Sequence, residues 1–193
     1  MLEVGCGEGD LARALAAIGY DVTAIDPMAP EGPIFRRIKL EDLEQDERFD
    51  AVVASHSFHH MVNLDQNLDR VATLLGGDGR LILDEFAWER FDEPTADWYE
   101  GQRRVLLAAL QNRRAPSAEE WLDHHADVHR SETIRAALTA RFEELAFERV
   151  PHLWRYLSGP ATAELEESLI ASGAIQALGF RFVGIPGRER ALN

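Results

Sequence analysis

Residues 3–9 of the 193-residue chain read Glu-Val-Gly-Cys-Gly-Glu-Gly, and the prediction of the fold starts from these residues. Leu2–Val4 has the apolar character of a buried strand, and apolar side chains then recur at helical spacing over residues 10–18. The glycines therefore join a strand to a helix. Glycine lets the backbone turn sharply and lets a ligand approach without a Cβ in the way. We expect a ligand-binding turn at this junction.

The alternation of strand and helix continues beyond this turn. Apolar runs predict strands at residues 20–25, 34–38, 49–55 and 80–86, and an amphipathic pattern predicts a helix at 64–75, closed by Gly76-Gly77. Strands that alternate with helices predict parallel βαβ units with right-handed crossovers. Near-continuous apolar strands predict a sheet covered on both faces. The expected fold class is therefore α/β, a Rossmann-like, mostly parallel sheet with helices on both faces.

The character of the sequence changes after Phe86. Residues 87–130 predict helices and carry several aromatic side chains: Trp88, Phe91, Trp98, Tyr99 and Trp121. The α/β pattern then resumes, with helices predicted at 132–141 and 161–172 and strands at 143–150 and 180–185. We expect a single domain, residues 1–193, in which 87–130 is a helical insertion after the fifth strand and a substrate cap. The aromatic side chains either line an acceptor pocket or pack the insertion.

Composition restricts the partners of the chain. The net charge of −14 repels phosphate backbones, which disfavours nucleic-acid binding, and only Arg103-Arg104 and Arg113-Arg114 offer a local basic patch. No stretch approaches the roughly 20 apolar residues of a membrane span, and the N-terminus lacks the pattern of a secretory signal. The single cysteine, Cys6, excludes an internal disulfide and suits a reducing compartment. We expect a cytoplasmic protein with a small-molecule substrate.

An acidic residue follows the glycine loop at an informative distance. Asp26 lies about 20 residues further on, at the end of the second predicted strand, where a carboxylate can accept hydrogen bonds from ribose hydroxyls. A dinucleotide loop reads G-x-G-x-x-G, but here the third glycine comes one position early. Glu8 and Asp10 near the helix N-terminus would repel a pyrophosphate and suit a ligand with sulfonium and ammonium groups. Charge therefore favours S-adenosylmethionine over NAD.

Residues 3–9 resemble motif I of the class I S-adenosylmethionine-dependent methyltransferases, and the match is closest to the small-molecule "type 11" group. The resemblance extends over residues 2–86. Asp26 matches the acid that holds the cofactor ribose in that family, and Glu41-Asp42-Leu43 resembles the segment whose acid meets the adenine amino group, with Asp42 as the first choice and Glu41 as the second. His59-His60-Met61, after the strand at 49–55, resembles the loop after the family's fourth strand.

The resemblance implies that the cofactor is S-adenosyl-L-methionine. It implies a set of cofactor-binding residues: Glu3, Gly5, Cys6, Gly7 and Gly9 around the methionine part, Asp26 at the ribose, Asp42 and Leu43 at the adenine, and Ser55 beside the cofactor. The family also has a helix and more of the first strand ahead of the glycine loop. The resemblance therefore implies a chain truncated at its N-terminus.

Methyl transfer from a sulfonium is an in-line displacement, so the main task of the protein is to align the acceptor. A general base helps when the acceptor carries a proton, and His56 and His60, at or after the end of the fourth strand, are the candidates for this catalytic role. Glu85, at the end of the fifth strand, is a further candidate for contact with the acceptor. His125 and His129 have a metal-binding spacing but lack the other ligands, so no metal is expected.

The sequence thus predicts an enzyme, a transferase that moves a methyl group from S-adenosylmethionine to a small organic acceptor. Two alternatives stay open. One is an NAD-linked oxidoreductase of similar fold, and the other is a non-catalytic binding protein that has lost activity.

Overall fold

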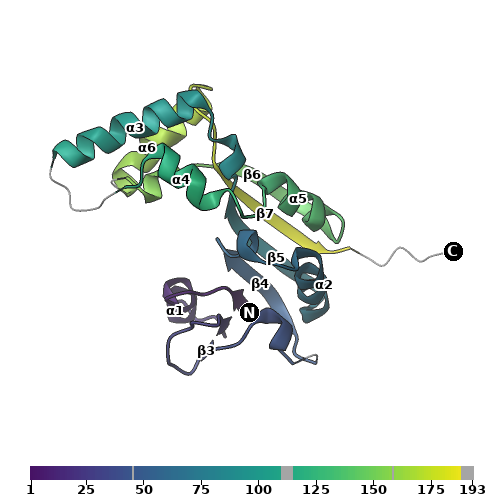
Figure 1. Ribbon diagram of the computed structural model, residues 1–193. Helices are drawn as coiled ribbons and strands as arrows, with labels where there is room; N and C mark the ends of the chain where they lie inside the picture. Colours follow the sequence, from purple (N-terminus) through teal and green to yellow (C-terminus); the bar gives the residue numbers. More distant parts are fainter. Residues whose placement is uncertain (45, 110–114, 158, 188–193) are drawn as a thin grey trace. The chain divides into compact units, whose positions relative to one another are not determined.

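The computed structural model describes residues 1–44, 46–109, 115–157 and 159–187 (Figure 1). Within these residues, seven strands form one sheet of order β3-β2-β1-β4-β5-β7-β6. The strands are β1 (Leu2–Val4), β2 (Thr23–Ile25), β3 (Phe35–Arg36), β4 (Phe49–Ser55), β5 (Leu75–Phe86), β6 (Phe142–Val150) and β7 (Gly179–Pro186). The predicted α/β fold with a mostly parallel sheet is confirmed.

The order of the strands reverses between β1 and β4. β1 pairs in parallel with β2 on one side and with β4 on the other, so that Val4 lies opposite both Ile25 and Ala54. The chain extends the sheet from β2 to β3 in one direction and from β4 to β5 in the other, again in parallel. A reversal of this kind opens a crevice at the carboxyl ends of the two central strands. The glycine loop leaves β1 at this edge.

Helix α1 (Asp10–Ala17) connects β1 to β2, and α2 (Leu64–Leu74) connects β4 to β5. The two connections move in opposite directions along the sheet, so right-handed crossovers place them on opposite faces, as Figure 1 shows. The buried side chains of α2 are Leu64, Leu68, Val71 and Leu74. Their spacing gives one apolar stripe that packs on the sheet.

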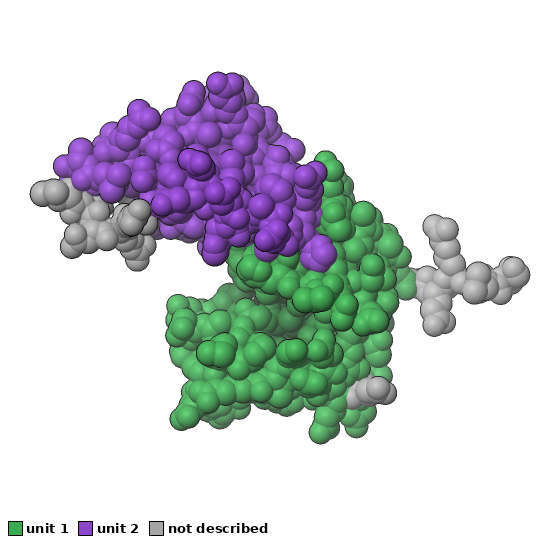
Figure 2. Space-filling model, viewed as in Figure 1, with its two compact units in different colours: residues 1–85, 132–147, 181–193 green, residues 86–131, 148–180 purple. Residues whose placement is uncertain are grey.

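The chain forms two compact units (Figure 2): residues 1–85, 132–147 and 181–193 make the first, and residues 86–131 and 148–180 the second. The second unit therefore contains the expected insertion at 87–130 together with residues 148–180. The sequence pattern had placed residues 148–180 in the α/β part of the chain. The role of residues 87–130 as a substrate cap stays a prediction.

The second unit is built on helices α3 (Glu93–Ala108), α4 (Ala118–His125) and α6 (Pro160–Ala171), with short 3-10 turns η3 (Trp88–Arg90) and η4 (Leu153–Arg155). Its buried core contains Phe86, Phe91, Tyr99, Ala115, Trp121, Leu153, Leu157 and Leu178. Tyr99 and Trp121 are thus core residues, whereas Trp88 and Trp98 are partly buried against them.

The remaining elements are α5 (Ser131–Thr139), which precedes β6, and two 3-10 turns, η1 (Leu40–Asp42) and η2 (Phe58–His60). Several boundaries differ from the sequence prediction, most of them by one or two residues, and two differences are larger. β2 begins at Thr23 rather than residue 20, because Tyr20 is exposed and the first buried residue is Val22. Gly76 and Gly77 belong to β5, where the register with β4 shifts between Phe49 and Ala51.

No helix in the described part of the chain is both long and apolar enough to cross a membrane. Arg103 is tied down within the second unit: its Nε donates to the carbonyl oxygen of Ala115 at 3.0 Å, and its guanidinium pairs with Glu100 at 3.2 Å. Arg113 and Arg114 lie outside the described residues.

Candidate functional site

The glycine loop folds back on the end of β2. Gly5, Gly7 and Gly9 all have positive φ angles, of 75°, 49° and 79°. The amide nitrogens of Gly5 and Cys6 both donate to the carbonyl oxygen of Ile25, at 2.9 and 3.2 Å. Positive φ is costly for residues with a Cβ, which explains glycine at each of these turns.

Two of these glycines also lie against neighbouring side chains. A Cβ built on Gly5 would lie 2.4 Å from the Cβ of Ser57, and one on Gly9 would lie 2.5 Å from the ring of Phe35. Ser57 is itself held by a hydrogen bond from its Oγ to the carbonyl oxygen of Val4, at 3.0 Å. The loop after β1 is therefore packed against the loop after β4.

Asp26 connects the loop to the end of β2. Its Oδ2 accepts a hydrogen bond from the amide of Gly7 at 3.2 Å, and its Oδ1 accepts one from the amide of Met28 at 2.7 Å. A carboxylate has about four acceptor positions, so two bonds fix its orientation and leave acceptor capacity for a ligand. Asp26 lies at the wall of a cavity.

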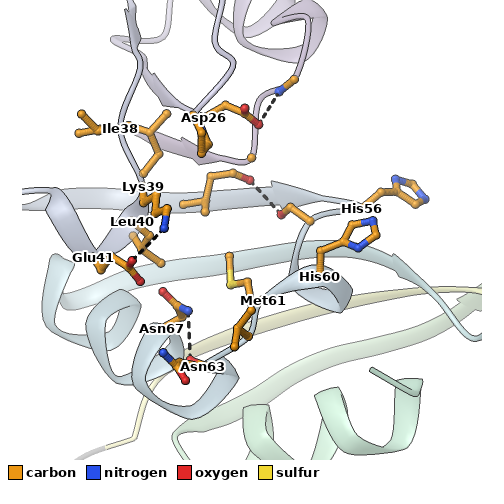
Figure 3. Close-up of a pocket in the computed structure, with 17 residues that line it drawn as sticks. Asp26, Ile38, Lys39, Leu40, Glu41, His56, His60, Met61, Asn63 and Asn67 are labelled. Atoms are coloured by element: carbon orange, nitrogen blue, oxygen red, sulfur yellow. Dashed lines mark hydrogen bonds and ion pairs between the residues drawn. The ribbon is translucent and has the colours of Figure 1, made fainter. Parts of the chain in front are cut away.

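This cavity, of about 690 Å³, lies entirely in the first unit (Figure 3). It is lined by Val4, Gly5, Gly7, Ile25, Asp26, Pro27, Ile38, Lys39, Leu40, Glu41, His56, Ser57, His60, Met61, Val62, Asn63 and Asn67. Cofactor cavities typically measure roughly 300–1,000 Å³ and combine apolar walls with a few polar groups. The lining comes from the segments that follow β1, β2, β3 and β4, at one edge of the sheet.

Polar side chains line several parts of the cavity. Figure 3 shows His56 and His60 on one side and Lys39 with Glu41 on the other. Lys39 Nζ lies 3.5 Å from a Glu41 carboxylate oxygen, and both side chains are more than half exposed. A ligand with its ribose at Asp26 would thus have different surroundings at its two ends.

His56 adopts an unusual backbone conformation. Its φ is 53°, and among the described residues no other non-glycine residue has a positive φ. Its amide donates to the carbonyl oxygen of Asp84 at 2.8 Å, and its Nδ1 lies 2.9 Å from Ser55 Oγ. Strained residues of this kind concentrate at functional sites, where the surrounding structure holds them in place.

Glu85 is completely buried and does not line the cavity. Its Oε1 accepts from the amides of Phe58 at 2.7 Å and His59 at 3.4 Å, and its Oε2 lies 2.8 Å from His59 Nδ1. The carboxylate therefore holds the turn η2 rather than facing the cavity.

Several residues expected at the cofactor do not line the cavity. Glu3 is 3% exposed, and burial raises its pKa to about 7, although a backbone hydrogen bond from Ala12 acts in the opposite direction. Burial, with the nearby carboxylates of Glu3 and Asp26, raises the pKa of the Cys6 thiol to about 11. Gly9 lies against Phe35, and Ser55 lies one residue before the lining.

At the segment after β3, the cavity is lined by Glu41 rather than by Asp42. Asp42 is exposed, and Leu43 is buried with its carbonyl oxygen bonded to Arg70. Of the expected residues, the structure brings together Gly5, Gly7, Asp26, His56 and His60 at the cavity.

Sequence reasoning did not identify the other lining residues as site residues: Val4, Ile25, Pro27, Ile38, Lys39, Leu40, Ser57, Met61, Val62, Asn63 and Asn67. Their signal was positional, because they lie at strand ends, in the loops that follow them, or at the start of the next helix, at the carboxyl edge of the sheet. Apolar and amide side chains carry no chemical signature of their own at such places.

The charge near the start of α1 is smaller than the sequence suggested. Arg13 pairs with Asp10 at 3.2 Å and donates to the carbonyl oxygen of Glu8 at 2.8 Å. Asp10 is 94% exposed, so this pair is screened by solvent. Within the described ranges, no group of three or more His, Cys, Asp or Glu side chains is placed to hold a metal ion. His125 is buried, with its Nδ1 2.6 Å from the carbonyl oxygen of Trp121.

Comparison with known proteins agrees with this arrangement. A family described as a methyltransferase domain matches residues 1–152. An uncharacterized methyltransferase of Staphylococcus carnosus is 33% identical over 115 residues, which are 53% of this chain and 55% of the relative. A ubiquinone biosynthesis O-methyltransferase of Rhodopseudomonas palustris is 28% identical over 96 residues, 43% of this chain and 38% of that protein. The chain thus spans about half or less of the length of these relatives.

Among solved structures, the chain is similar to 1,6-didemethyltoxoflavin-N1-methyltransferase of Burkholderia thailandensis, which was crystallised with 1,6-didemethyltoxoflavin and S-adenosylhomocysteine. The identity is 19% and the TM-score 0.58, over 97% of this chain and 70% of that one. At this identity the likeness concerns the fold.

Proposed function

The chain belongs to the methyltransferase domain family, and we propose that it transfers a methyl group from S-adenosylmethionine to a small organic acceptor. The observation that carries the proposal is the cavity at the carboxyl edge of β1 and β2, where the glycine loop and Asp26 meet. The relatives named above include enzymes described as O- and N-methyltransferases. Either atom is therefore a candidate acceptor.

The cavity supports one orientation of the cofactor. Asp26 would accept hydrogen bonds from the ribose hydroxyls, and Gly5 and Gly7 leave room for the backbone to approach the methionine part. The adenine would lie toward Lys39, Leu40 and Glu41, and Glu41 would then have the role for which Asp42 was the first expectation. The other expected residues would not contact the cofactor but would hold these segments in shape: Glu3, Cys6, Gly9, Leu43 and Ser55.

Bound S-adenosylmethionine supplies a methyl group already activated on a sulfonium, so alignment of the acceptor is the main requirement. His56 or His60 would take the proton that the acceptor loses when it receives the methyl group. Both rings line the same side of the cavity. The amide of His56 donates to the carbonyl oxygen of Asp84, which holds its backbone at the end of β4.

Titration calorimetry with S-adenosylmethionine, S-adenosylhomocysteine and NAD tests the proposal. We expect the first two to bind and NAD to bind far more weakly. Transfer of labelled methyl groups to a panel of phenols and amines then tests the enzyme activity. Preferential binding of NAD would support the oxidoreductase alternative, and absence of binding by all three would support a non-catalytic protein.

A further inference from the structure

A buried acid–imidazole pair lies directly behind the cavity wall. Glu85 is 0% exposed and His59 is 5% exposed, and neither lines the cavity. Burial of an ionised carboxylate is costly unless hydrogen-bond donors compensate for the lost water. The two backbone amides of Phe58 and His59, together with His59 Nδ1, are such donors.

The pair fixes the chemistry of the His59 ring. When the Glu85 carboxylate accepts in the contact of 2.8 Å between its Oε2 and His59 Nδ1, the proton of that hydrogen bond is on Nδ1. A carboxylate that bonds one ring nitrogen of a histidine fixes both its tautomer and its orientation.

The turn held in this way carries part of the cavity wall. η2 consists of residues 58–60, and the next residue, Met61, donates its amide to the carbonyl oxygen of Phe58 at 3.1 Å. His60 and Met61 both line the cavity, and the ring centroids of His59 and His60 are 4.1 Å apart. A change in the orientation of His59 would therefore reach His60 through both the backbone and the rings.

We propose that Glu85 and His59 are a positioning pair, in which the Glu85 carboxylate orients His59 and the turn at 58–61 and so places His60 and Met61 in the wall of the ligand cavity. The inference rests on the proposed function for its ligand. It concerns residues that touch no ligand themselves.

Three variants separate this role from a general effect on stability. Glu85→Gln keeps an acceptor for the Phe58 amide but offers an NH₂ group to His59 Nδ1. His59→Phe keeps a ring and removes the donor, whereas His59→Asn removes the ring and keeps an N–H near the position of Nδ1. We expect Glu85→Gln and His59→Phe to weaken binding of S-adenosylhomocysteine by fivefold or more. His59→Asn should keep most of the affinity for S-adenosylhomocysteine that His59→Phe loses.

Glu166→Gln is the matched control. Glu166 is also 0% exposed, and its carboxylate accepts from the amides of His152, Leu153 and Trp154 at 2.8–3.0 Å, in the second unit. Its loss should lower the melting temperature without changing affinity for S-adenosylhomocysteine. Equal losses of affinity in Glu85→Gln and Glu166→Gln, or unchanged affinity in folded Glu85→Gln, would overturn the proposal.

A nitrogen-15 NMR spectrum of the histidine rings gives a readout that does not depend on the ligand. We expect a proton on His59 Nδ1 in the unsubstituted protein, its transfer to Nε2 in Glu85→Gln, and a shift of the His60 ring resonances in that variant. The proposal is overturned if His59 Nδ1 is unprotonated in the unsubstituted protein, or if the His60 ring resonances do not shift in Glu85→Gln. If the unsubstituted protein fails to bind S-adenosylhomocysteine, the proposed function fails, and this spectrum still decides on the pair.

Discussion

The Cβ of Ser57 occupies the space that a side chain on Gly5 would need, since a Cβ built on Gly5 lies 2.4 Å from it. This contact joins the loop after β1 to the loop after β4 across the switch in strand order. It explains why the first glycine of the loop tolerates no side chain even apart from its positive φ of 75°.

Gly5→Ala should therefore destabilise the protein more than Gly7→Ala. Both replacements place alanine at a positive φ, which costs roughly 1–2 kcal/mol. Only Gly5→Ala adds an overlap, worth a further 1–3 kcal/mol or so, because nothing lies within 4 Å of a Cβ built on Gly7. Denaturant unfolding of the two variants measures the difference. Equal destabilisation would show that the two loops separate easily.

Asp26→Ala should weaken binding of S-adenosylmethionine by roughly 1–3 kcal/mol, the scale of hydrogen bonds to a charged group. Glu31→Ala is the control, because Glu31 is a nearby, 91% exposed carboxylate outside the cavity. Calorimetry on both folded variants gives the comparison. Unchanged affinity in Asp26→Ala would refute the ribose assignment.

Glu3 should make stability depend on pH. Its folded pKa of about 7 lies above the ordinary value of 4.5, so between these values the folded state holds a proton that the unfolded state has released. This contribution to stability is present at pH 4.5 and is lost as the pH rises to about 7, by at most about 3 kcal/mol.

Glu3→Gln, which stays neutral, should lack this contribution to the pH dependence. The stability of Glu3→Gln relative to the unsubstituted protein should thus be higher at pH 8 than at pH 5. Urea unfolding at both pH values measures it. A relative stability that stays constant with pH would mean that the Glu3 carboxyl titrates alike in the folded and unfolded states.

His56→Ala and His60→Ala should bind S-adenosylhomocysteine but differ in turnover. Replacing the histidine that acts as general base should lower the methyl-transfer rate roughly 10²–10⁴-fold. The rate is measured with an acceptor identified in the labelled-methyl assay. The other variant then serves as the control. Full turnover in both would remove the imidazoles from the mechanism.

The sequence predicted the elements with strong local signals. β4 spans Phe49–Ser55 as expected, because the run from Ala51 to Ala54 is apolar and its end is polar. The loop at 3–9 was predictable because closely spaced glycines mark a turn that needs positive φ angles. Asp26 was predictable because a carboxylate directly after an apolar strand is visible in the sequence itself. Helices α3 and α4, within the range 87–130, were also predictable from the pattern of the sequence.

The remaining features depend on contacts between distant residues. The association of residues 87–130 with Leu153, Leu157 and Leu178 is a matter of packing, which spacing along the chain does not encode. The position of Glu85 near a strand end predicts contact with the acceptor, yet its partner in the structure, His59, lies 26 residues earlier in the chain. Whether Glu41 or Asp42 lines the cavity depends on how the short turn η1 is oriented. Two adjacent acidic residues in a sequence do not show which of them faces the cavity.

The position of Glu85 in the chain has a consequence for biosynthesis. Every described residue that lines the cavity falls between Val4 and Asn67, so a ribosome has translated the whole binding wall before it reaches β5. Because chains begin to fold during synthesis, an emerging segment can possess all of its ligand contacts while the turn at 58–61 still lacks its anchor. The cavity lining is thus synthesised before Glu85, and the turn at 58–61 can meet its carboxylate partner only after β5 has left the ribosome.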